Sequence, residues 1–173
     1  MVDILKKITD KRKLRVEELK KTTAKADFIA QIDKNNRSAR RFTNALKSGK
    51  MSIIAEVKKA SPSKGIFRDS FPYLEIAKSY ENGGAAAISV LTEPDFFLGE
   101  NRYLEEISAN TSIPILRKDF IIDEIQLYEA KAIGADAVLL IAGVLDGEAL
   151  GRLMKICGEL KLDYIVEVHN EEE

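Results

Sequence analysis

Two hydrophobic patterns divide the chain near residue 51. Before this point, apolar residues recur at helical spacing among lysines, which predicts an amphipathic helix over residues 3–22 and a second helical run over residues 38–46. The second run ends at Ser48-Gly49, a typical helix stop. We therefore expect residues 1–50 to form an N-terminal helical extension.

After residue 51, short apolar runs alternate with amphipathic stretches. The runs expected to form strands cover residues 51–58, 85–91, 113–118, 135–142 and 163–168. Helical stretches lie between them, near residues 72–82, 101–109, 123–133 and 146–161, and glycines such as Gly84, Gly134 and Gly158 mark helix ends. No Asn-Gly hairpin signal separates alternating strands. The pattern predicts an α/β protein with a parallel sheet covered by helices.

Both an open doubly wound sheet and a (β/α) barrel fit this alternation. No predicted strand is followed by a G-x-G-x-x-G dinucleotide turn. An eight-unit barrel needs roughly 250 residues, whereas residues 51–173 leave room for about five strand–helix units. Length alone favours an open sheet or an incomplete barrel, and the polar residues decide between them.

Polar side chains appear late in four of the predicted strands. Glu56 and Lys58 share one face of the first strand, Ser89 lies on the second, and Lys118 and Glu167 end the third and fifth. In a (β/α) barrel, active sites lie at this end of the strands. Two lysines and two glutamates there are typical of acid–base machinery. An ion-pair network that plugs the barrel, or charges that simply reach water, are the alternatives.

Weaker candidates follow the strands. The segment from Ser61 to Gly65 is either a phosphate-contacting loop or a turn. Phe96, Phe97 and Phe120 either stack on an aromatic substrate or belong to the core. The sole histidine, His169, offers no metal cluster, so we expect no metal.

Composition and charge narrow the class of protein. The net charge is −1, yet residues 1–50 hold 15 Lys and Arg against 6 Asp and Glu. This basic arm fits a solvated helix face, attraction of an anionic small-molecule substrate, or nucleic acid. No RNA-binding signature or zinc spacing supports nucleic acid, so we expect no such partner.

The chain also lacks the signals of export and membrane insertion. No stretch approaches the roughly 18 apolar residues of a membrane span, and the start has no signal-peptide pattern. A single cysteine, Cys157, excludes an internal disulfide and is expected to be a core thiol. These features predict a cytoplasmic protein without a membrane partner.

Five ordered segments resemble the indole-3-glycerol-phosphate synthase family. They are Ile54-Ala55-Glu56-Val57-Lys58-Lys59-Ala60-Ser61-Pro62-Ser63-Lys64-Gly65, Ile88-Ser89-Val90-Leu91-Thr92-Glu93, Pro114-Ile115-Leu116-Arg117-Lys118-Asp119-Phe120-Ile121, Gly134-Ala135-Asp136-Ala137-Val138-Leu139-Leu140-Ile141 and Val166-Glu167-Val168-His169-Asn170. The resemblance implies a carbon–carbon lyase of tryptophan biosynthesis that uses no cofactor. Its substrate is 1-(2-carboxyphenylamino)-1-deoxyribulose 5-phosphate, which undergoes ring closure, decarboxylation and dehydration to indole-3-glycerol phosphate.

Site roles follow from the same resemblance. It implies that Lys118 is a general acid, that Glu167 is a general base, that Lys58 binds an anionic substrate group and shares the acid role, and that Glu56 orients both lysines. Which lysine acts at which step stays open. The substrate contacts implied are Ser61, Ser89, Phe97, Phe120 and Leu139.

The end of the chain departs from the family pattern. The family continues through three more strands and the loops that grip the phosphate. Residues 51–173 are therefore expected to form the first five strands and four helices of an incomplete (β/α)8 (TIM) barrel, an N-terminal fragment with little or no activity of its own. The alternative is a non-catalytic barrel fragment that self-associates through open sheet edges.

Overall fold

One parallel sheet organises the molecule. The computed structural model describes residues 4–35, 40–47, 51–67 and 70–173. The strands of the sheet lie in the order β1-β4-β5-β6-β7, with bounds Ile54–Val57, Ala87–Leu91, Ile115–Lys118, Ala137–Ile141 and Asp163–Glu167. The connecting helices are α4 (Tyr73–Asn82), α5 (Asn101–Asn110), α6 (Ile125–Ala132) and α7 (Gly147–Leu160).

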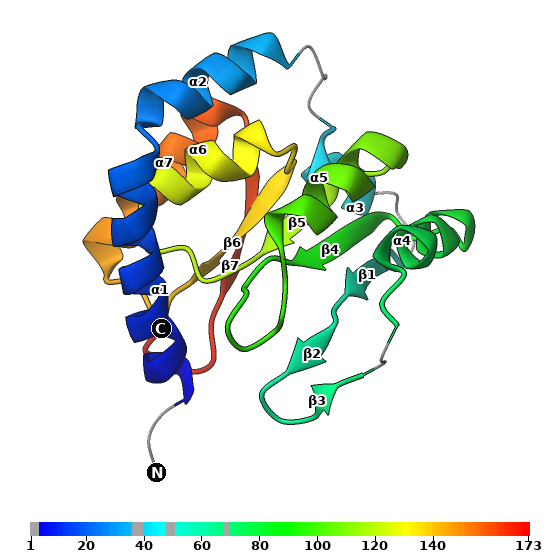
Figure 1. Cartoon of the computed structure of the whole chain (residues 1–173), viewed down its shortest axis with the longest axis horizontal. Coiled ribbons are helices and arrows are strands. Elements are labelled where there is room, and N and C mark those ends of the chain that lie inside the picture. The colour runs from blue at the N-terminus through cyan, green and yellow to red at the C-terminus, as the bar shows by residue number, and fades with distance from the viewer. Residues whose placement is uncertain (1–3, 36–39, 48–50, 68–69) are drawn as a thin grey trace.

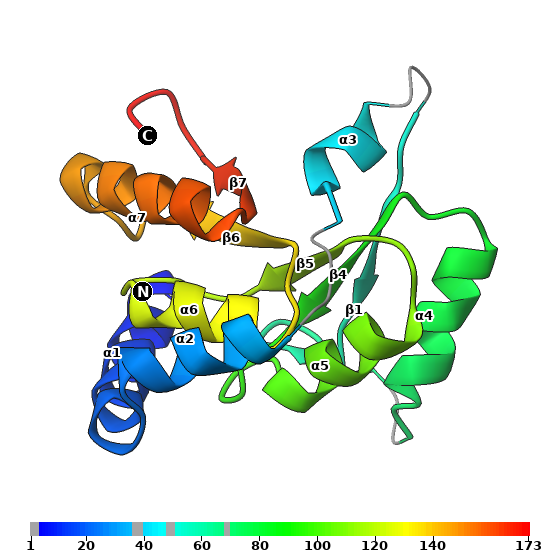
Figure 2. The same ribbon diagram turned by 90° about the horizontal axis from the view of Figure 1, so that it is seen from above.

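Strand order distinguishes the two architectures that the sequence allowed. Within this sheet, each strand pairs in parallel with the sheet strand that follows it in sequence. The order never reverses as it does in a doubly wound sheet. The sheet curves, and α4 to α7 follow its convex face (Figure 2). This confirms the predicted partial (β/α) barrel.

The main hydrophobic core lies between the sheet and its helices. Every residue of β4 and β6 is buried on both faces, which explains why these strands read as continuous apolar runs. The outward residues of the strands pack against the apolar faces of α4 to α7, and the buried members include Val57, Ile88, Val90, Ile115, Val138, Leu140, Ala77, Leu104, Ile107, Leu127, Leu153 and Cys157.

A smaller core lies on the concave face. Helix α3 (Phe42–Leu46) packs on this side of the sheet, opposite α5 and α6 (Figure 2). Phe42 packs against Ala87 of β4, Leu116 of β5 and Ala137 of β6. Two of these partners are alanines, so the sheet leaves room for the ring.

The N-terminal helices pack against α6 of the helical layer. Helix α1 (Ile4–Thr22) confirms the first predicted helix, and α2 (Lys25–Lys34) lies along α6 (Figure 1). Helix α2 was not predicted, because it is ten residues long, buries only Phe28 and starts after Ala24, which offers no capping side chain. The second predicted helix covered residues 38–46. Residues 38 and 39 lie outside the described part, and the observed helix α3 starts at Phe42.

Two local features differ from the sequence prediction. Strands β2 (Ala60–Ser61) and β3 (Gly65–Ile66) form a small antiparallel hairpin where no hairpin was expected, and Gly65 has a positive φ of 66°. Gly158 does not end a helix, because α7 continues to Leu160 and Lys161 takes the left-handed conformation. No helix in the described ranges is long and apolar enough to cross a membrane.

Candidate functional site

A cavity of about 210 Å³ opens at the carboxyl ends of the strands. All four predicted catalytic residues line it, together with three of the five predicted substrate contacts. The lining consists of Glu56, Lys58, Leu91, Phe97, Lys118, Asp119, Phe120, Leu139, Ile141 and Glu167. Larger hollows of about 410 and 430 Å³ lie beside α1 and beside β1 and α4, but neither joins the ends of several strands.

Strand register turns the charged residues to one face of the sheet. Leu91 pairs with Lys118 and Ile141 pairs with Glu167 in the parallel ladder. Paired residues of neighbouring parallel strands point to the same face, so these side chains project together on the concave side. The alternation that the sequence showed therefore becomes a cluster in space.

The four charges form two ion pairs. Lys58 donates a hydrogen bond to Glu56 within the first strand segment, and Lys118 Nζ lies 2.9 Å from Glu167 Oε2, which joins β5 to β7. Their side chains are 28–34% exposed, so water reaches them. Mutual neutralisation and partial hydration lower the cost of placing four charges at the cavity mouth.

Aromatic side chains form one wall of the cavity. Phe97 and Phe120 follow β4 and β5, and their ring centroids are 6.2 Å apart at 35°. Both rings are partly exposed, which distinguishes them from core aromatics such as Phe42. The wall is suited to contact an aromatic ring of a ligand.

The two predicted serine contacts lie outside the cavity lining. Ser89 is the sheet partner of Glu56, and its Oγ is buried without a hydrogen-bond partner in the described part of the chain. Ser61 lies in β2, where its Oγ accepts a hydrogen bond from the Lys64 N–H at 3.3 Å. Their substrate-binding roles stay predictions.

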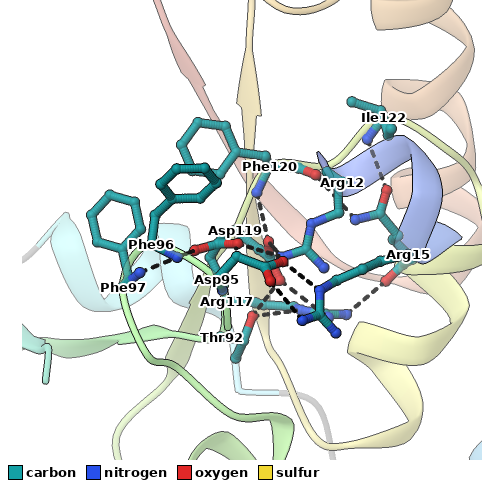
Figure 3. Close-up of polar contacts among 12 residues, drawn as sticks. Arg12, Arg15, Thr92, Asp95, Phe96, Phe97, Arg117, Asp119, Phe120 and Ile122 are labelled. Atoms are coloured by element: carbon teal, nitrogen blue, oxygen red, sulfur yellow. Dashed lines mark hydrogen bonds and ion pairs between the residues drawn. The ribbon is translucent and has the colours of Figure 1, made fainter. Parts of the chain in front are cut away.

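A buried polar network beside the cavity was not predicted. Arg117 is fully buried on the helix-facing side of β5, and its guanidinium contacts Asp119 at 3.3 Å (Figure 3). It also contacts Glu129 at 2.6 Å. Burial lowers the pKa of Arg117, but the charges of Glu129 and Asp119 more than offset this and raise it. The two-residue alternation of a strand could have predicted this burial, because it points Arg117 to the opposite face from Lys118, toward the helices that cover the sheet.

Cys157 lies in the core, away from the four charged residues, whereas His169 borders one of them. Cys157 is buried, and desolvation raises the pKa of its thiol to about 12, so the thiolate nucleophile does not form near neutral pH. His169 is about half exposed and lies 3.3 Å from Glu167. Within the described ranges, no group of three or more His, Cys, Asp or Glu side chains could hold a metal ion.

Comparison with known proteins points to one family. Residues 5–173 match the family model described as indole-3-glycerol phosphate synthase. The chain is 50% identical over 171 residues to the protein of that name from Ruminiclostridium cellulolyticum, covering 98% of this chain and 66% of the relative. The corresponding protein of Endomicrobium trichonymphae is 51% identical over 174 residues, with the same coverages. The chain thus spans just under two thirds of these relatives' length.

Proposed function

The chain belongs to the indole-3-glycerol phosphate synthase family, and we propose that its strand-end cavity performs the reaction in that name. The substrate would be 1-(2-carboxyphenylamino)-1-deoxyribulose 5-phosphate, and the products indole-3-glycerol phosphate, carbon dioxide and water. The observation that carries the proposal is the gathering of two Lys–Glu pairs and two phenylalanine rings around one cavity.

Ring closure is the first step. The ring carbon that bears the carboxylate attacks the carbonyl carbon of the sugar chain, and the carbonyl electrons move to oxygen. Lys118 donates a proton to that oxygen as it becomes negative, which lowers the barrier. The carboxylate then leaves as carbon dioxide, and its bonding electrons return to the ring.

Dehydration is the second step. The new hydroxyl group takes a proton and leaves as water, while Glu167 accepts a proton from the neighbouring CH₂ group. Lys58 holds an anionic group of the substrate and shares the acid role. Glu56 orients Lys58 through their hydrogen bond. The 2.9 Å contact between Lys118 and Glu167 places the proposed acid beside the proposed base.

The cavity wall suits the organic part of the substrate. Phe97, Phe120 and Leu139 offer apolar contact for the carboxyphenyl ring. The lysines attract its negative groups, so an anionic small molecule is the partner that we propose. We also propose that residues 1–50 act as a helical extension of the barrel units in residues 51–173, and that the reaction takes place in the cytoplasm.

Turnover of the carboxyphenylamino substrate tests the assignment. Indole fluorescence of the product would be followed for the chain alone and for the chain mixed with the remaining third of the Ruminiclostridium cellulolyticum relative. Lys118→Met is expected to lower kcat by roughly 10²–10⁴-fold, because it removes a general acid. Lys155→Met on exposed α7 surface is the matched control and is expected to retain activity.

Two results would count against the proposal. Absence of turnover in both the single chain and the mixture would remove the assigned reaction. Turnover retained in folded Lys118→Met would leave the reaction in place but exclude Lys118 as its acid.

Self-association of the chain is the second candidate. The described sheet ends at β1 and β7, and the outward side chains Tyr164 and Val166 of β7 are exposed. Unpaired strand edges with apolar side chains promote pairing between copies. Sedimentation velocity at rising concentration is expected to show dimers or larger species, and Val166→Lys to reduce them. A monomer at all concentrations would exclude this candidate.

A further inference from the structure

We infer that Arg12 of α1 is a positioning residue for the cavity, because its guanidinium lies between two buried carboxylates that each hold one aromatic loop. These carboxylates belong to Glu93 and Asp119. Figure 3 shows Arg12 reaching from α1 toward the loops of Phe97 and Phe120. The kinetic consequence of this inference rests on the proposed function.

Asp119 holds the end of β5. Its side chain is fully buried and accepts hydrogen bonds from Arg12, from Thr92 Oγ1 at 2.6 Å and from the Phe120 N–H at 2.8 Å. The residue before it, Lys118, accepts a backbone hydrogen bond from Thr92 at 3.2 Å. Anchoring Asp119 therefore restrains a cavity residue on either side of it, the proposed acid Lys118 and the ring of Phe120.

Glu93 holds the loop after β4. Its buried carboxylate accepts hydrogen bonds from the backbone N–H groups of Asp95 at 3.0 Å, Phe96 at 2.7 Å and Phe97 at 3.0 Å. Three amide donors on one carboxylate determine the path of this segment. The carboxylate thereby places the Phe97 ring against the cavity.

Arg12 joins the two loops. Its side chain is 8% exposed, it donates to Asp119, and its Nη2 lies 3.9 Å from Glu93 Oε1. Arg117 also contacts Asp119, but its other contacts run to Thr92, Asn101, Gln126 and Glu129. Arg12 therefore offsets the repulsion between two neighbouring buried carboxylates on the cavity side. Its removal is expected to let the loops move apart.

Arg12→Met tests the inference, since it removes the charge and keeps most of the volume. We expect kcat to fall by roughly 10- to 100-fold through misplacement of Lys118. We expect KM to rise about three- to tenfold through loss of aromatic contacts. Val16→Ala, one turn further along the same buried face of α1, is the control. It weakens helix packing without touching the network, so both constants are expected to stay within about twofold of the original.

Amide hydrogen exchange gives a second readout that needs no turnover. In Arg12→Met, protection of the Phe96, Phe97 and Phe120 amides is expected to fall by at least about tenfold beyond any loss in Val16→Ala. If Arg12→Met does not fold, Arg12→Lys is used, because a lysine reaches one carboxylate but not both. It is then expected to preserve protection at Phe120 and lose it at Phe97.

The outcomes separate this inference from the proposed function. If the original protein shows no turnover, the proposed function fails and exchange alone decides the role of Arg12. If the Arg12 variant that folds matches Val16→Ala in exchange, and in kinetics where there is turnover, Arg12 has no positioning role.

Discussion

Neighbouring basic residues of β5 have different environments. Lys118 points into the cavity and is about a quarter exposed, whereas Arg117 points into the helical layer and is fully buried. Arg117 can be buried because two carboxylates and several oxygen acceptors surround its planar guanidinium. Strand alternation thus separates a residue proposed for chemistry from a residue that supports the fold.

Removal of the buried arginine is expected to be costly. Arg117→Met would leave Asp119 and Glu129 with fewer partners, and we expect the free energy of unfolding to fall by about 3–5 kcal/mol. Urea denaturation measures this change. Arg102→Met is the matched control, because the ion pair of Arg102 with Glu100 is exposed and contributes less than about 1 kcal/mol. Equal losses in the two variants would contradict the importance of burial.

Helix ends show how local chemistry sets the length of an element. Asp146 caps α7 by accepting a hydrogen bond from the Ala149 N–H at 2.7 Å. At the other end, the left-handed residue is Lys161, with φ 53° and ψ 42°, rather than Gly158. Ile156 and Cys157 on one side of Gly158 are buried, and so is Leu162 beyond the helix end. The helix continues past Gly158 because this packing holds the chain on both sides of the glycine.

Glycine at the end of α7 is expected to stabilise the protein. Lys161→Gly relieves the left-handed strain of a residue with a side chain, and we expect a gain of about 0.5–1 kcal/mol. Thermal unfolding measures the effect. Lys155→Gly, within the same helix, is expected to lose a similar amount because glycine weakens helix interiors. A loss at position 161 would show that its side chain contributes more than the strain costs.

At the scale of the whole molecule, the sheet separates two cores of unequal size. The larger core binds α4 to α7 to the convex face, and the smaller core holds α3 on the concave face through Phe42. The catalytic candidates lie on that same concave side, at the carboxyl ends of the strands. Helix α3 therefore fills a part of the concave face that is separate from the cavity of the charged residues.

Loss of the Phe42 ring is expected to destabilise the fold. Phe42→Ala would leave a cavity against Ala87, Leu116 and Ala137, and we expect a cost of about 3–5 kcal/mol. Denaturant unfolding with circular dichroism measures it. Phe67→Ala is the control, since Phe67 is exposed and its removal leaves no buried void. A cost below about 1 kcal/mol for Phe42→Ala would show that α3 does not contribute to the inner core.

Much of this organisation could be read from local patterns. Apolar runs and helical spacing predicted the five parallel strands and their four helices, because the central strands β4, β5 and β6 are largely buried and the helices lay apolar faces on the sheet. Alternation along the strands was enough to name Glu56, Lys58, Lys118 and Glu167, which do meet in one cavity. Helix α2 was missed although Phe28 belongs to the core and Ile32 packs against it, because the helix is only ten residues long and starts after Ala24, which offers no capping side chain.

By itself, the sequence determined the strand–helix alternation, the family resemblance and the residues that face the strand ends, since these depend on periodicity and residue type. The tertiary structure decided which charges pair, and it separated Phe97, Phe120 and Leu139 from Ser61 and Ser89. It also revealed that Arg12, Glu93 and Asp119 meet. These contacts join residues up to 107 positions apart, and no local pattern encodes a distance that depends on how a helix packs against a sheet.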